Sequence, residues 1–540
     1  MNELLKSNSK AIVHLRQQYK CRRLGLVFGA GISKDLDFPN WSDLVKGIAE
    51  HEDVDGGVIY KNDSKWSSST SITQLLFQHF KSTRMAVLEA QYPSVAYRER
   101  HVKADWREIV HSVLYRSALE SRFDKVKNHP YLINFIPLIN GSEFSVNYNF
   151  DDTLEYMLSI QKWNQRESKG RPYQSVWNPH MQFRENTAVI YHPNGYLPGD
   201  KNLQQSDELV FSEESFSDQL LESMSGKLST LLHMFTKKTC LLVGLSLQDN
   251  TLKHLLRQSS VISPGNFHYF IRYTSNRDTL TDNEKNAIFN SNFEVYNLIT
   301  LFLDSEEISN LAELVSMDTE EFVNLANIAG VDTNYNYYLV GTVGAGKSTI
   351  LDHFGNLKLY EEWLEERPHD LAKPFSQLTS DEKERVDEWV NSQFFKKNLK
   401  LLSEKEGIHL IDRTPLDPIT FSPDDESMKL RAASMLKIIS PGNSNYQISL
   451  GHVLLVRSTP KELKNRLLSK RKTEWSEDDI ALLQERALKI YDSFGLKAID
   501  NIGRTIPEIV KEVARIIHIE DYQPTNLHLK LQEVAESETP

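Results

Sequence analysis

Short apolar runs, each bounded by turn residues, recur along this chain and alternate with stretches of helical periodicity. Runs this short are typical of strands buried on both faces, and helices between successive buried strands favour a parallel sheet. The pattern therefore predicts an α/β fold. The runs lie at Leu24–Phe28, Ala188–Tyr191, Thr239–Val243 and Phe267–Ile271 and, in a second series, at Tyr337–Val340, His409–Ile411 and His452–Val456.

The interval between the two series divides the chain. At 540 residues the chain is long enough for several domains, each with its own core. Strand signals stop in this interval, and an acidic, helix-like stretch takes their place. We expect a first α/β domain at residues 1–304, a connecting helical segment at 305–334, a second α/β domain at 335–525 and a terminal tail at 526–540.

Composition excludes some classes of function. The net charge of −12 argues against nucleic acid as a partner, because phosphate binding depends on clustered Lys and Arg. No window holds the roughly 18 consecutive apolar residues that span a bilayer, so we expect no membrane contact and a cytoplasmic location. The two cysteines, Cys21 and Cys240, permit one disulfide at most and are too few for a four-cysteine zinc site.

A glycine-rich segment follows the first apolar run directly. It reads Gly29-Ala30-Gly31-Ile32-Ser33. A strand that turns straight into a helix at glycines lets the backbone approach a diphosphate, which free amides and the helix dipole favour. The usual dinucleotide fingerprint has a third glycine where this chain has Lys34, so the segment alone is equally consistent with an ordinary tight turn.

Further segments follow in a fixed order, together with Phe38-Pro39-Asn40-Trp41. They are Asn147-Tyr-Asn149-Phe-Asp151-Asp152-Thr-Leu-Glu155, Tyr191-His192-Pro-Asn194-Gly195-Tyr-Leu-Pro198 and Val243-Gly244-Leu-Ser246-Leu-Gln-Asp249. In this order the segments resemble the prokaryotic sirtuin-like branch found in antiviral defence proteins, over roughly residues 20 to 300. The resemblance implies a Rossmann-like, sirtuin-type sheet that binds NAD⁺.

The resemblance also implies roles for single residues. The implied diphosphate-binding residues are Gly29, Ala30, Gly31 and Ser33, and the residues implied to line the adenosine side are Gly244 and Ser246. Asn149 and Asp151 match the family's pair beside the nicotinamide ribose, and His192 is the candidate base. The family usually ends this strand with His-Gly, whereas here Asn194 precedes Gly195.

Alternatives remain for these catalytic candidates. Asn149 would equally serve as the cap of a helix at residues 151–159. Asn147 competes for the same catalytic role, and we prefer Asn149 because only that register puts Asp151 in place. His192 could be a structural histidine rather than a base.

The expected reaction is hydrolysis of the nicotinamide–ribose bond. Nicotinamide leaves as a neutral molecule, and the ribosyl cation that develops resembles that of glycoside hydrolysis. Asp151 would stabilise the cation, Asn149 would position a water molecule, and His192 would accept a proton. Protein-deacetylating sirtuins carry a four-cysteine zinc module, which this chain lacks, so we expect no zinc. Residues 31–147 look like a helical insertion rather than a peptide groove.

The second series of strands opens with a P-loop pattern. The residues are Gly341-Thr-Val-Gly344-Ala-Gly346-Lys347-Ser348-Thr349, between a predicted strand and a predicted helix at Ile350–Phe354. The amides and Lys347 would cradle the phosphates of ATP or another nucleotide, and Ser348 would reach a Mg²⁺ ion.

The rest of this domain resembles deoxynucleoside and nucleoside-monophosphate kinases. Asp412 and Arg413 match the acidic-Arg segment that holds the acceptor, and Glu361-Glu362-Trp363 is a poorer match to the acceptor-side acid. Basic residues around the predicted helix Lys461–Lys470 resemble a kinase lid, although a solvated basic helix would look the same. They are Arg457, Arg466, Arg471 and Lys472.

Together these motifs predict an antiphage effector that depletes NAD⁺ in abortive infection, regulated by a nucleotide-binding, kinase-like domain. The expected partners are a nucleotide ligand and either a second copy of the chain or a companion defence protein. Two alternatives stay open. One is a nucleotide or deoxynucleoside kinase, and the other is a nucleotide-binding regulatory scaffold with an inactive sirtuin-like fold.

Overall fold

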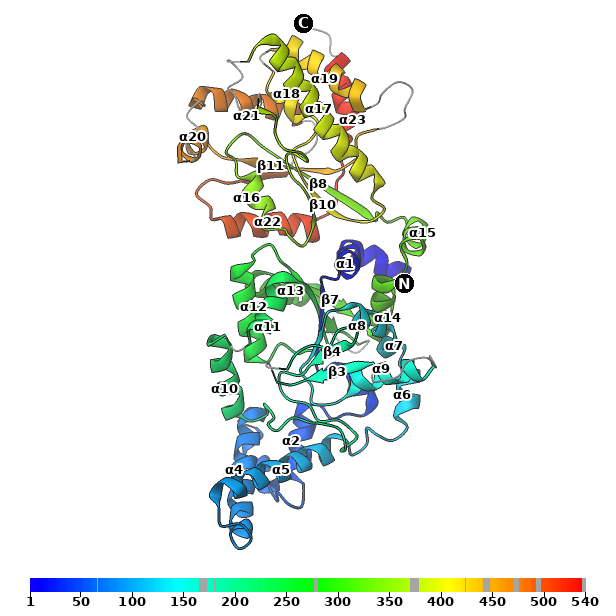
Figure 1. Ribbon diagram of the computed structural model, residues 1–540, viewed down its shortest axis with the longest axis vertical. Coiled ribbons are helices and arrows are strands. Elements are labelled where there is room, and N and C mark those ends of the chain that lie inside the picture. Colours follow the sequence, from blue (N-terminus) through cyan, green and yellow to red (C-terminus); the bar gives the residue numbers. More distant parts are fainter. Residues whose placement is uncertain are drawn as a thin grey trace. The chain divides into compact units, whose positions relative to one another are not determined.

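The computed structural model describes most of the chain and divides it into two compact units (Figure 1). Unit 1 contains Gln18–Ile262 and Phe267–Ser316, and unit 2 contains Asn2–Gln17, Ser263–Asn266 and Met317–Pro540. Each unit is built on one parallel sheet, as the apolar runs predict. The described residues are 1–65, 67–164, 172–178, 181–226, 228–275, 280–369, 378–422, 424–439, 447–469, 475–491 and 497–536.

The sheet of unit 1 has seven strands in the order β3-β4-β2-β1-β5-β6-β7. They are β1 Leu24–Phe28, β2 Ser145–Asn147, β3 Tyr173–Val176, β4 Ala188–Tyr191, β5 Thr239–Val243, β6 His268–Tyr273 and β7 Leu298–Leu303. Phe28 at the end of β1 pairs with Asn147 of β2 on one side and with Val243 of β5 on the other. The strand order reverses beside β1, and in open α/β sheets ligands bind outside the carboxyl ends of the strands at such a point.

Helices α2 to α8 fill the connection from β1 to β2 and form the expected helical insertion (Figure 1). Asn40 begins α2 by accepting a hydrogen bond from the amide of Asp43 at 2.9 Å. The helices of unit 1 are α2 Trp41–Ala49, α3 Gly57–Asp63, α4 Ser69–Glu89, α5 Val95–Leu114, α6 Arg122–Asn128, α7 Pro130–Asn134, α8 Ile136–Gly141, α9 Thr153–Asn164, α10 Glu213–Met224, α11 Ser229–Lys237, α12 Asn250–Ile262, α13 Asp282–Tyr296 and α14 Ser305–Ser316.

The segment after β1 differs from the expectation of a strand that turns directly into a helix. Two short 3₁₀ turns, η1 Ala30–Ile32 and η2 Lys34–Leu36, follow β1, and an α-helix begins only at Trp41. Asp37 ends the second turn with a left-handed backbone (φ +62°). The dipole of a long helix is therefore not available to a ligand at Gly29.

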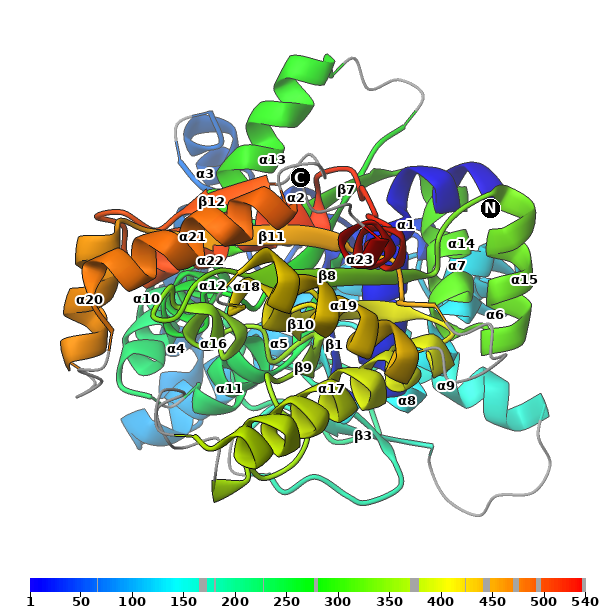
Figure 2. The ribbon, with the colours of Figure 1, turned by 90° about the horizontal axis from the view of Figure 1, so that it is seen from above.

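The sheet of unit 2 has five strands in the order β12-β11-β8-β10-β9, which Figure 2 shows from above. Its strands are β8 Asn334–Val340, β9 Lys358–Tyr360, β10 Gly407–Asp412, β11 His452–Arg457 and β12 Lys497–Asp500. Its helices are α15 Thr319–Ala329, α16 Lys347–Leu351, α17 Ser380–Ser403, α18 Asp417–Thr420, α19 Asp425–Ile439, α20 Pro460–Ser469, α21 Glu477–Tyr491, α22 Ile506–His518 and α23 Leu527–Glu536.

Helices cover both faces of this second sheet. Tyr338 and Val340 of β8 belong to a core shared with α17, α18, α19, α21 and α23, while α16 and α22 lie on the other face (Figures 1 and 2). The side chain of Tyr337, next along β8, donates a hydrogen bond to the carbonyl of Ile517 at 3.0 Å, toward α22. Alternate side chains of a strand point to opposite faces, so β8 anchors both layers.

The first helix, α1 (Asn2–Lys20), packs into unit 2 through residues 2–17, although the sequence groups it with the first domain. Arg16, which is fully buried, pairs with Glu406 at 2.7 Å and lies 3.8 Å from the ring centre of Phe322. The Gln17 side chain accepts a hydrogen bond from the amide of Ile408 at 2.9 Å. These contacts hold α1 in unit 2, and the chain then enters β1 of unit 1 at Leu24.

Candidate functional site

All four sirtuin-like motifs lie at one edge of the sheet in unit 1. Each motif begins at or just beyond the carboxyl end of a strand: Gly29 follows β1, Asn147 ends β2, His192 follows β4 and Gly244 follows β5. These strands are neighbours in the sheet and all run parallel. Motifs far apart in the sequence are therefore brought together at the edge where a ligand is expected.

A hydrogen-bonded chain of side chains links two of these motifs. The Asn149 amide donates to the Ser33 hydroxyl at 3.3 Å, and Ser33 donates in turn to both carboxylate oxygens of Asp151 at 3.0 Å. The Ser33 and Asp151 side chains are almost completely buried. Burial is the main cause that raises the pKa of Asp151, against the hydrogen bonds from Thr153 that lower it.

The capping alternative for Asn149 is wrong. The amide of Thr153, the first residue of α9, donates to the Asp151 carboxylate at 3.0 Å, so Asp151 and not Asn149 caps this helix. The Asn147 side chain instead accepts a hydrogen bond from the backbone N–H of Asn149 at 3.1 Å and stabilises the turn between them. Asn149 is thus left with its side chain in the Ser33–Asp151 chain.

His192 lies beneath this turn and is fully buried. Its Nδ1 atom is 3.0 Å from the carbonyl oxygen of Asn149, and its Nε2 atom is 2.8 Å from Oε1 of Glu155. Burial lowers the pKa of His192, but the charge and hydrogen bond of Glu155 and the Asn149 carbonyl outweigh burial and leave it raised. Because both ring nitrogens face oxygen acceptors, this geometry supports a protonated, structural imidazole rather than a free base.

Asn194, which stands where the family usually has histidine, is also buried and hydrogen-bonded. Its amide donates to the carbonyl of Tyr148 at 3.1 Å, and its Oδ1 atom accepts from the Gln219 side chain at 3.1 Å. Asn194 therefore ties the segment after β4 to the turn that carries Asn149.

The glycines Gly29, Gly31 and Gly244 meet in a close contact of two loops. The Gly31 amide donates to the carbonyl of Gly244 at 2.9 Å, and a Cβ atom on Gly31 would lie 2.7 Å from the Cα of Gly244. Gly244 has a left-handed backbone (φ +69°). The close packing of the two loops is therefore sufficient to require glycine at these positions, without any ligand. Ala30 and Ser246 are exposed at the same edge of the sheet.

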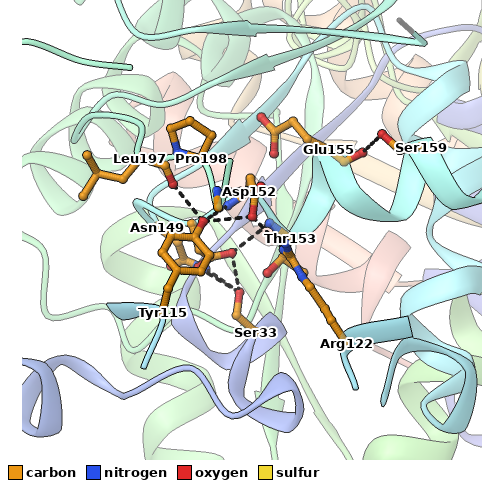
Figure 3. Close-up of polar contacts among 12 residues, drawn as sticks. Ser33, Tyr115, Arg122, Asn149, Asp152, Thr153, Glu155, Ser159, Leu197 and Pro198 are labelled. Carbon is orange, nitrogen blue, oxygen red and sulfur yellow. Dashed lines mark hydrogen bonds and ion pairs between the residues drawn. The ribbon is translucent and has the colours of Figure 1, made fainter. Parts of the chain in front are cut away.

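A buried charge cluster beside Asp151 was not found from the sequence. Asp152 accepts hydrogen bonds from the Tyr115 hydroxyl (2.8 Å), from Arg122 (2.7 Å) and from the amide of Gly199 (2.9 Å). Figure 3 shows Tyr115 and Arg122 converging on Asp152. Tyr115 and Arg122 come from the helical insertion, and Arg122 is 30 residues away from Asp152 in the chain, so no local pattern could reveal the contact.

The P-loop lies in unit 2, between β8 and α16. Its glycines all have positive φ: +149° at Gly341, +82° at Gly344 and +99° at Gly346. The Lys347 ammonium donates to the carbonyls of Gly341 at 2.8 Å and Thr342 at 3.2 Å. Burial lowers the pKa of Lys347 to about 8.

The helix after the P-loop begins and ends earlier in the chain than expected, at Lys347–Leu351. It ends at Leu351 rather than running to Phe354, and Thr349 lies within its single turn. A helix this short has little dipole, so an anion bound here would be held mainly by the backbone amides of the loop.

Ser348 and Asp412 fit a magnesium ion. The Ser348 hydroxyl, on α16, donates to Oδ2 of Asp412 at the end of β10 at 3.3 Å. The other carboxylate oxygen, Oδ1, is buried and has no hydrogen-bond partner among the described residues. Hydroxyl and carboxylate oxygens are the ligands that Mg²⁺ prefers.

Arg413 forms a second charged group next to this site. Its guanidinium is 2.9 Å from Glu362 and 3.4 Å from Asp417, and its backbone is left-handed (φ +68°). Arg413 and Asp417 line a small pocket together with Gly341 and Thr342 of the P-loop. Thr342 also borders a larger cavity of about 280 Å³.

Arg466 on α20 contacts Asn501 rather than an open site. Its guanidinium donates to the carbonyl and side-chain oxygens of Asn501 at 2.9 and 3.1 Å, and the Asn501 amide donates to the carbonyl of Ala345 at 2.8 Å. Arg466 thus supports the P-loop through Asn501. Arg471 and Lys472 lie outside the described residues.

Within the ranges given above, no group of three or more His, Cys, Asp or Glu side chains is arranged to hold a metal ion. No helix among the described residues is long and apolar enough to cross a membrane. Cys21 and Cys240 are both free thiols.

Comparison with known proteins matches residues 144–296 to the family described as SIR2-like domain. No curated protein matches the chain. Among solved structures, thymidylate kinase from Candida albicans is 16% identical over 36% of this chain and 98% of its own, with a TM-score of 0.26. Deoxyadenosine kinase from M. mycoides with bound dATP is 16% identical over 33% and 96%, with a TM-score of 0.27.

A third structure, NadR protein in complex with NAD and AMP-PNP, is 12% identical over 70% of this chain and 88% of its own, with a TM-score of 0.26. TM-scores this low carry no argument about fold or activity. The family match covers β2 to α13 and so includes the motifs after β2, β4 and β5. The chain therefore contains a SIR2-like domain, which lies in unit 1.

Proposed function

We propose that unit 1 binds NAD⁺ at the carboxyl edge of its sheet and hydrolyses the nicotinamide–ribose bond. The observation that supports the proposal is the Asn149–Ser33–Asp151 chain, which joins Asn149 and Asp151 of the matched SIR2-like domain to Ser33 after β1. A buried carboxylate beside an amide and a hydroxyl is suited to a cationic ribosyl centre, since charge stabilisation is stronger away from water.

Asp151 and Asn149 are the two residues that contact the reacting groups in this proposal. Asp151 stabilises the positive charge that develops on the ribose as neutral nicotinamide departs, and it then accepts the proton of the attacking water. The Asn149 side chain orients that water. His192 positions the turn through its contact with the Asn149 carbonyl. In this proposal His192 is a positioning residue and not the base that the sequence resemblance implies.

We further propose that unit 2 binds ATP or another nucleotide with Mg²⁺ and regulates unit 1. Lys347 and the P-loop amides would hold the phosphates, and Ser348 and Asp412 would hold the ion. The regulatory part is supported by connectivity: α1 packs into unit 2 and continues into β1, after which the Gly29–Ser33 segment begins. An NADase under such control would serve as an antiphage effector that acts alone or with a second copy or companion protein.

A nucleoside kinase activity in unit 2 is the second candidate. Arg413, Asp417 and Glu362 form a charged group beside the P-loop, which is suited to holding a hydroxyl acceptor. Phosphoryl transfer from ATP to nucleosides that is lost in Lys347→Ala but retained in Asn149→Ala would identify this activity.

The experiment that tests the main proposal is incubation of the purified full chain with NAD⁺ across a panel of nucleotides. We expect nicotinamide and ADP-ribose to appear in equal amounts, at a rate that one nucleotide changes. Hydrolysis at the same rate with every nucleotide would contradict the regulatory part. Binding of NAD⁺ without release of nicotinamide would instead support an inactive scaffold.

A further inference from the structure

Two carboxylates, Asp151 and Asp152, follow one another in the chain and are both buried at the start of α9. Two like charges on neighbouring residues disfavour each other's ionised form, and burial also disfavours the ionised form of a carboxyl group. Burial is the largest cause that raises the pKa of Asp151, and the Asp152 charge raises it further, whereas the hydrogen bonds from Thr153 and, to a smaller extent, the Arg122 charge lower it. Something must offset this repulsion if Asp151 is to act as a carboxylate.

Arg122 is placed to do so. It is about as buried as Asp152, and its Nη2 atom lies 2.7 Å from Oδ1 of Asp152. The rings of Tyr156 and Phe38 flank the guanidinium, at 4.1 and 5.6 Å from their centres. This enclosure fixes the guanidinium and strengthens its electrostatic effect at short range.

The Asp152 side chain also holds the active-site segments together. The Tyr115 hydroxyl bridges Asp152 and the carbonyl of Leu197 (Figure 3). The backbone amide of Gly199 also donates to Asp152. Asp152 thereby joins the insertion to the segment after β4 and to the turn that carries Asn149 and Asp151. If Arg122 were lost, Asp152 would be an uncompensated buried charge at this junction.

The other ionisable groups around Asp151 do not provide the same compensation. His192 faces Asp151 from the end of β4, but it is paired with Glu155 at 2.8 Å. Tyr115 faces Asp151 from the end of α5, and burial raises its pKa well above its usual value, so it remains neutral. Ser33 and Thr153 contribute uncharged donors. Among the described residues, Arg122 is thus the cation that pairs with Asp152 next to Asp151.

We propose that Arg122 is a positioning residue for NAD⁺ hydrolysis, which keeps Asp151 in its charged form by neutralising Asp152 and fixing it between the insertion and the catalytic turn. The proposal rests on the function proposed for unit 1. A buried ion pair is weak support for stability as such, because desolvation offsets the attraction. The buried Arg122–Asp152 ion pair is therefore better explained by its electrostatic effect on the protonation of Asp151 than by a contribution to stability.

The test compares Arg122→Met, Arg122→Lys, Asp152→Asn and the double variant Arg122→Met/Asp152→Asn in the full chain. Nicotinamide release is measured from pH 5 to 9, with kcat and KM determined separately at each pH. Arg122→Met should move the acid limb of kcat upward by about one pH unit, with little change in KM. In Arg122→Lys and in the double variant, the acid limb of kcat should lie close to its wild-type position. Melting profiles establish that each variant is folded.

Arg107→Met is the matched control. Arg107 is a half-buried arginine of α5 that donates to the carbonyl of Ser206 at 2.7 Å and does not contact Asp152. It should leave the pH profile unchanged. A loss of kcat by the same factor at every pH in Arg122→Met, or a double variant whose acid limb stays shifted, would overturn the proposal.

A readout independent of turnover separates this proposal from the proposed function. The pKa of Asp151 is followed by NMR of protein labelled with ¹³C at the aspartate carboxyl carbons, and the signal is assigned by its loss in Asp151→Asn. We expect Arg122→Met to raise this pKa and the double variant to restore it. If the wild-type protein releases no nicotinamide, the proposed function fails, and the Asp151 titration alone decides the role of Arg122.

Discussion

The Nε2 atom of His192 lies 2.8 Å from Oε1 of Glu155, while its Nδ1 atom lies 3.0 Å from the carbonyl oxygen of Asn149. The Ser175 hydroxyl also donates to Oε1 of Glu155 at 2.8 Å. His192 therefore connects strand β3 and helix α9 to the turn that carries the candidate catalytic asparagine. With both ring nitrogens occupied, His192 is placed to hold the turn in position rather than to contact a substrate.

The role of His192 can be tested by substitution. His192→Ala leaves the buried Glu155 carboxylate without its cation, so we expect the free energy of unfolding to fall by about 3 kcal/mol, as measured by denaturant titration. Loss of a general base would slow the reaction by about 10²- to 10⁴-fold, whereas we expect folded His192→Gln to lose less than about tenfold in kcat. A hundredfold loss in a variant of unchanged stability would restore His192 as the base.

The second prediction concerns acid sensitivity in unit 2. His14 of α1 is fully buried, and its ring centre lies 4.9 Å from that of His518. Burial lowers the pKa of His14 to about 4, although the hydrogen bond to the Asn356 carbonyl raises it. The unfolded chain takes up a proton below pH 6.5 and the folded chain does not, so this contribution to stability is lost as the pH falls from about 6.5 to 4. We expect a loss of roughly 3 kcal/mol over that range.

His14→Gln should remove much of this pH dependence, because a neutral amide can still donate to the Asn356 carbonyl. Unfolding of the full chain at pH 7 and pH 5 checks this, with His79→Gln, an exposed position on α4, as the control. Equal acid sensitivity in wild type and His14→Gln would show that the buried histidine is not responsible.

The third prediction concerns Gly31. A methyl group there would lie 2.7 Å from the Cα of Gly244, so Gly31→Ala must push the two loops apart. We expect a loss of about 1–3 kcal/mol in the free energy of unfolding without any ligand. Gly57→Ala is the control, since a Cβ there meets nothing within 4 Å. A Gly31→Ala protein that is as stable as the wild type but fails to bind NAD⁺ would mean that the glycine serves only ligand approach.

The fourth prediction concerns the P-loop. Lys347→Ala removes a buried ammonium beside Asp412, and we expect the affinity for ATP with Mg²⁺ to fall about ten- to hundredfold. Isothermal titration calorimetry measures this change, with Lys400→Ala, an exposed position on α17, as the control. Equal ATP affinity in both variants and the wild type would exclude Lys347 from phosphate binding.

The buried strands with continuous apolar runs were predictable from the sequence. β1, β4 and β5 have the expected bounds, whereas the three-residue strand β2 (Ser145–Asn147) is too short and polar to give a periodic signal. β7 (Leu298–Leu303) is apolar except for Thr300, and such a run alone does not distinguish a strand from a buried helix. The membership of α1 in unit 2 depends on contacts such as Arg16–Glu406, which join residues far apart in the chain.

The candidate site, like the fold, was predictable only in part. Asn149, Asp151 and Ser33 could be chosen from motif order, and the structure brings them into one hydrogen-bonded chain. The structural role that we propose for His192 rests on its contact with the buried Glu155, and periodicity does not predict which oxygen a histidine will contact. Arg122 and Tyr115 were missed because their contacts to Asp152 span 30 and 37 residues without a local pattern.

The most direct test of the account is the release of nicotinamide from NAD⁺ by the full chain and by Asn149→Ala and Asp151→Asn. Reaction products are separated by chromatography, and melting profiles establish that the three proteins are equally folded. The account predicts that the wild type, with its activating nucleotide, forms nicotinamide and ADP-ribose, and that both variants bind NAD⁺ but release almost none. Release that continues unchanged in both variants, or that is absent from the wild type with every nucleotide, would contradict it.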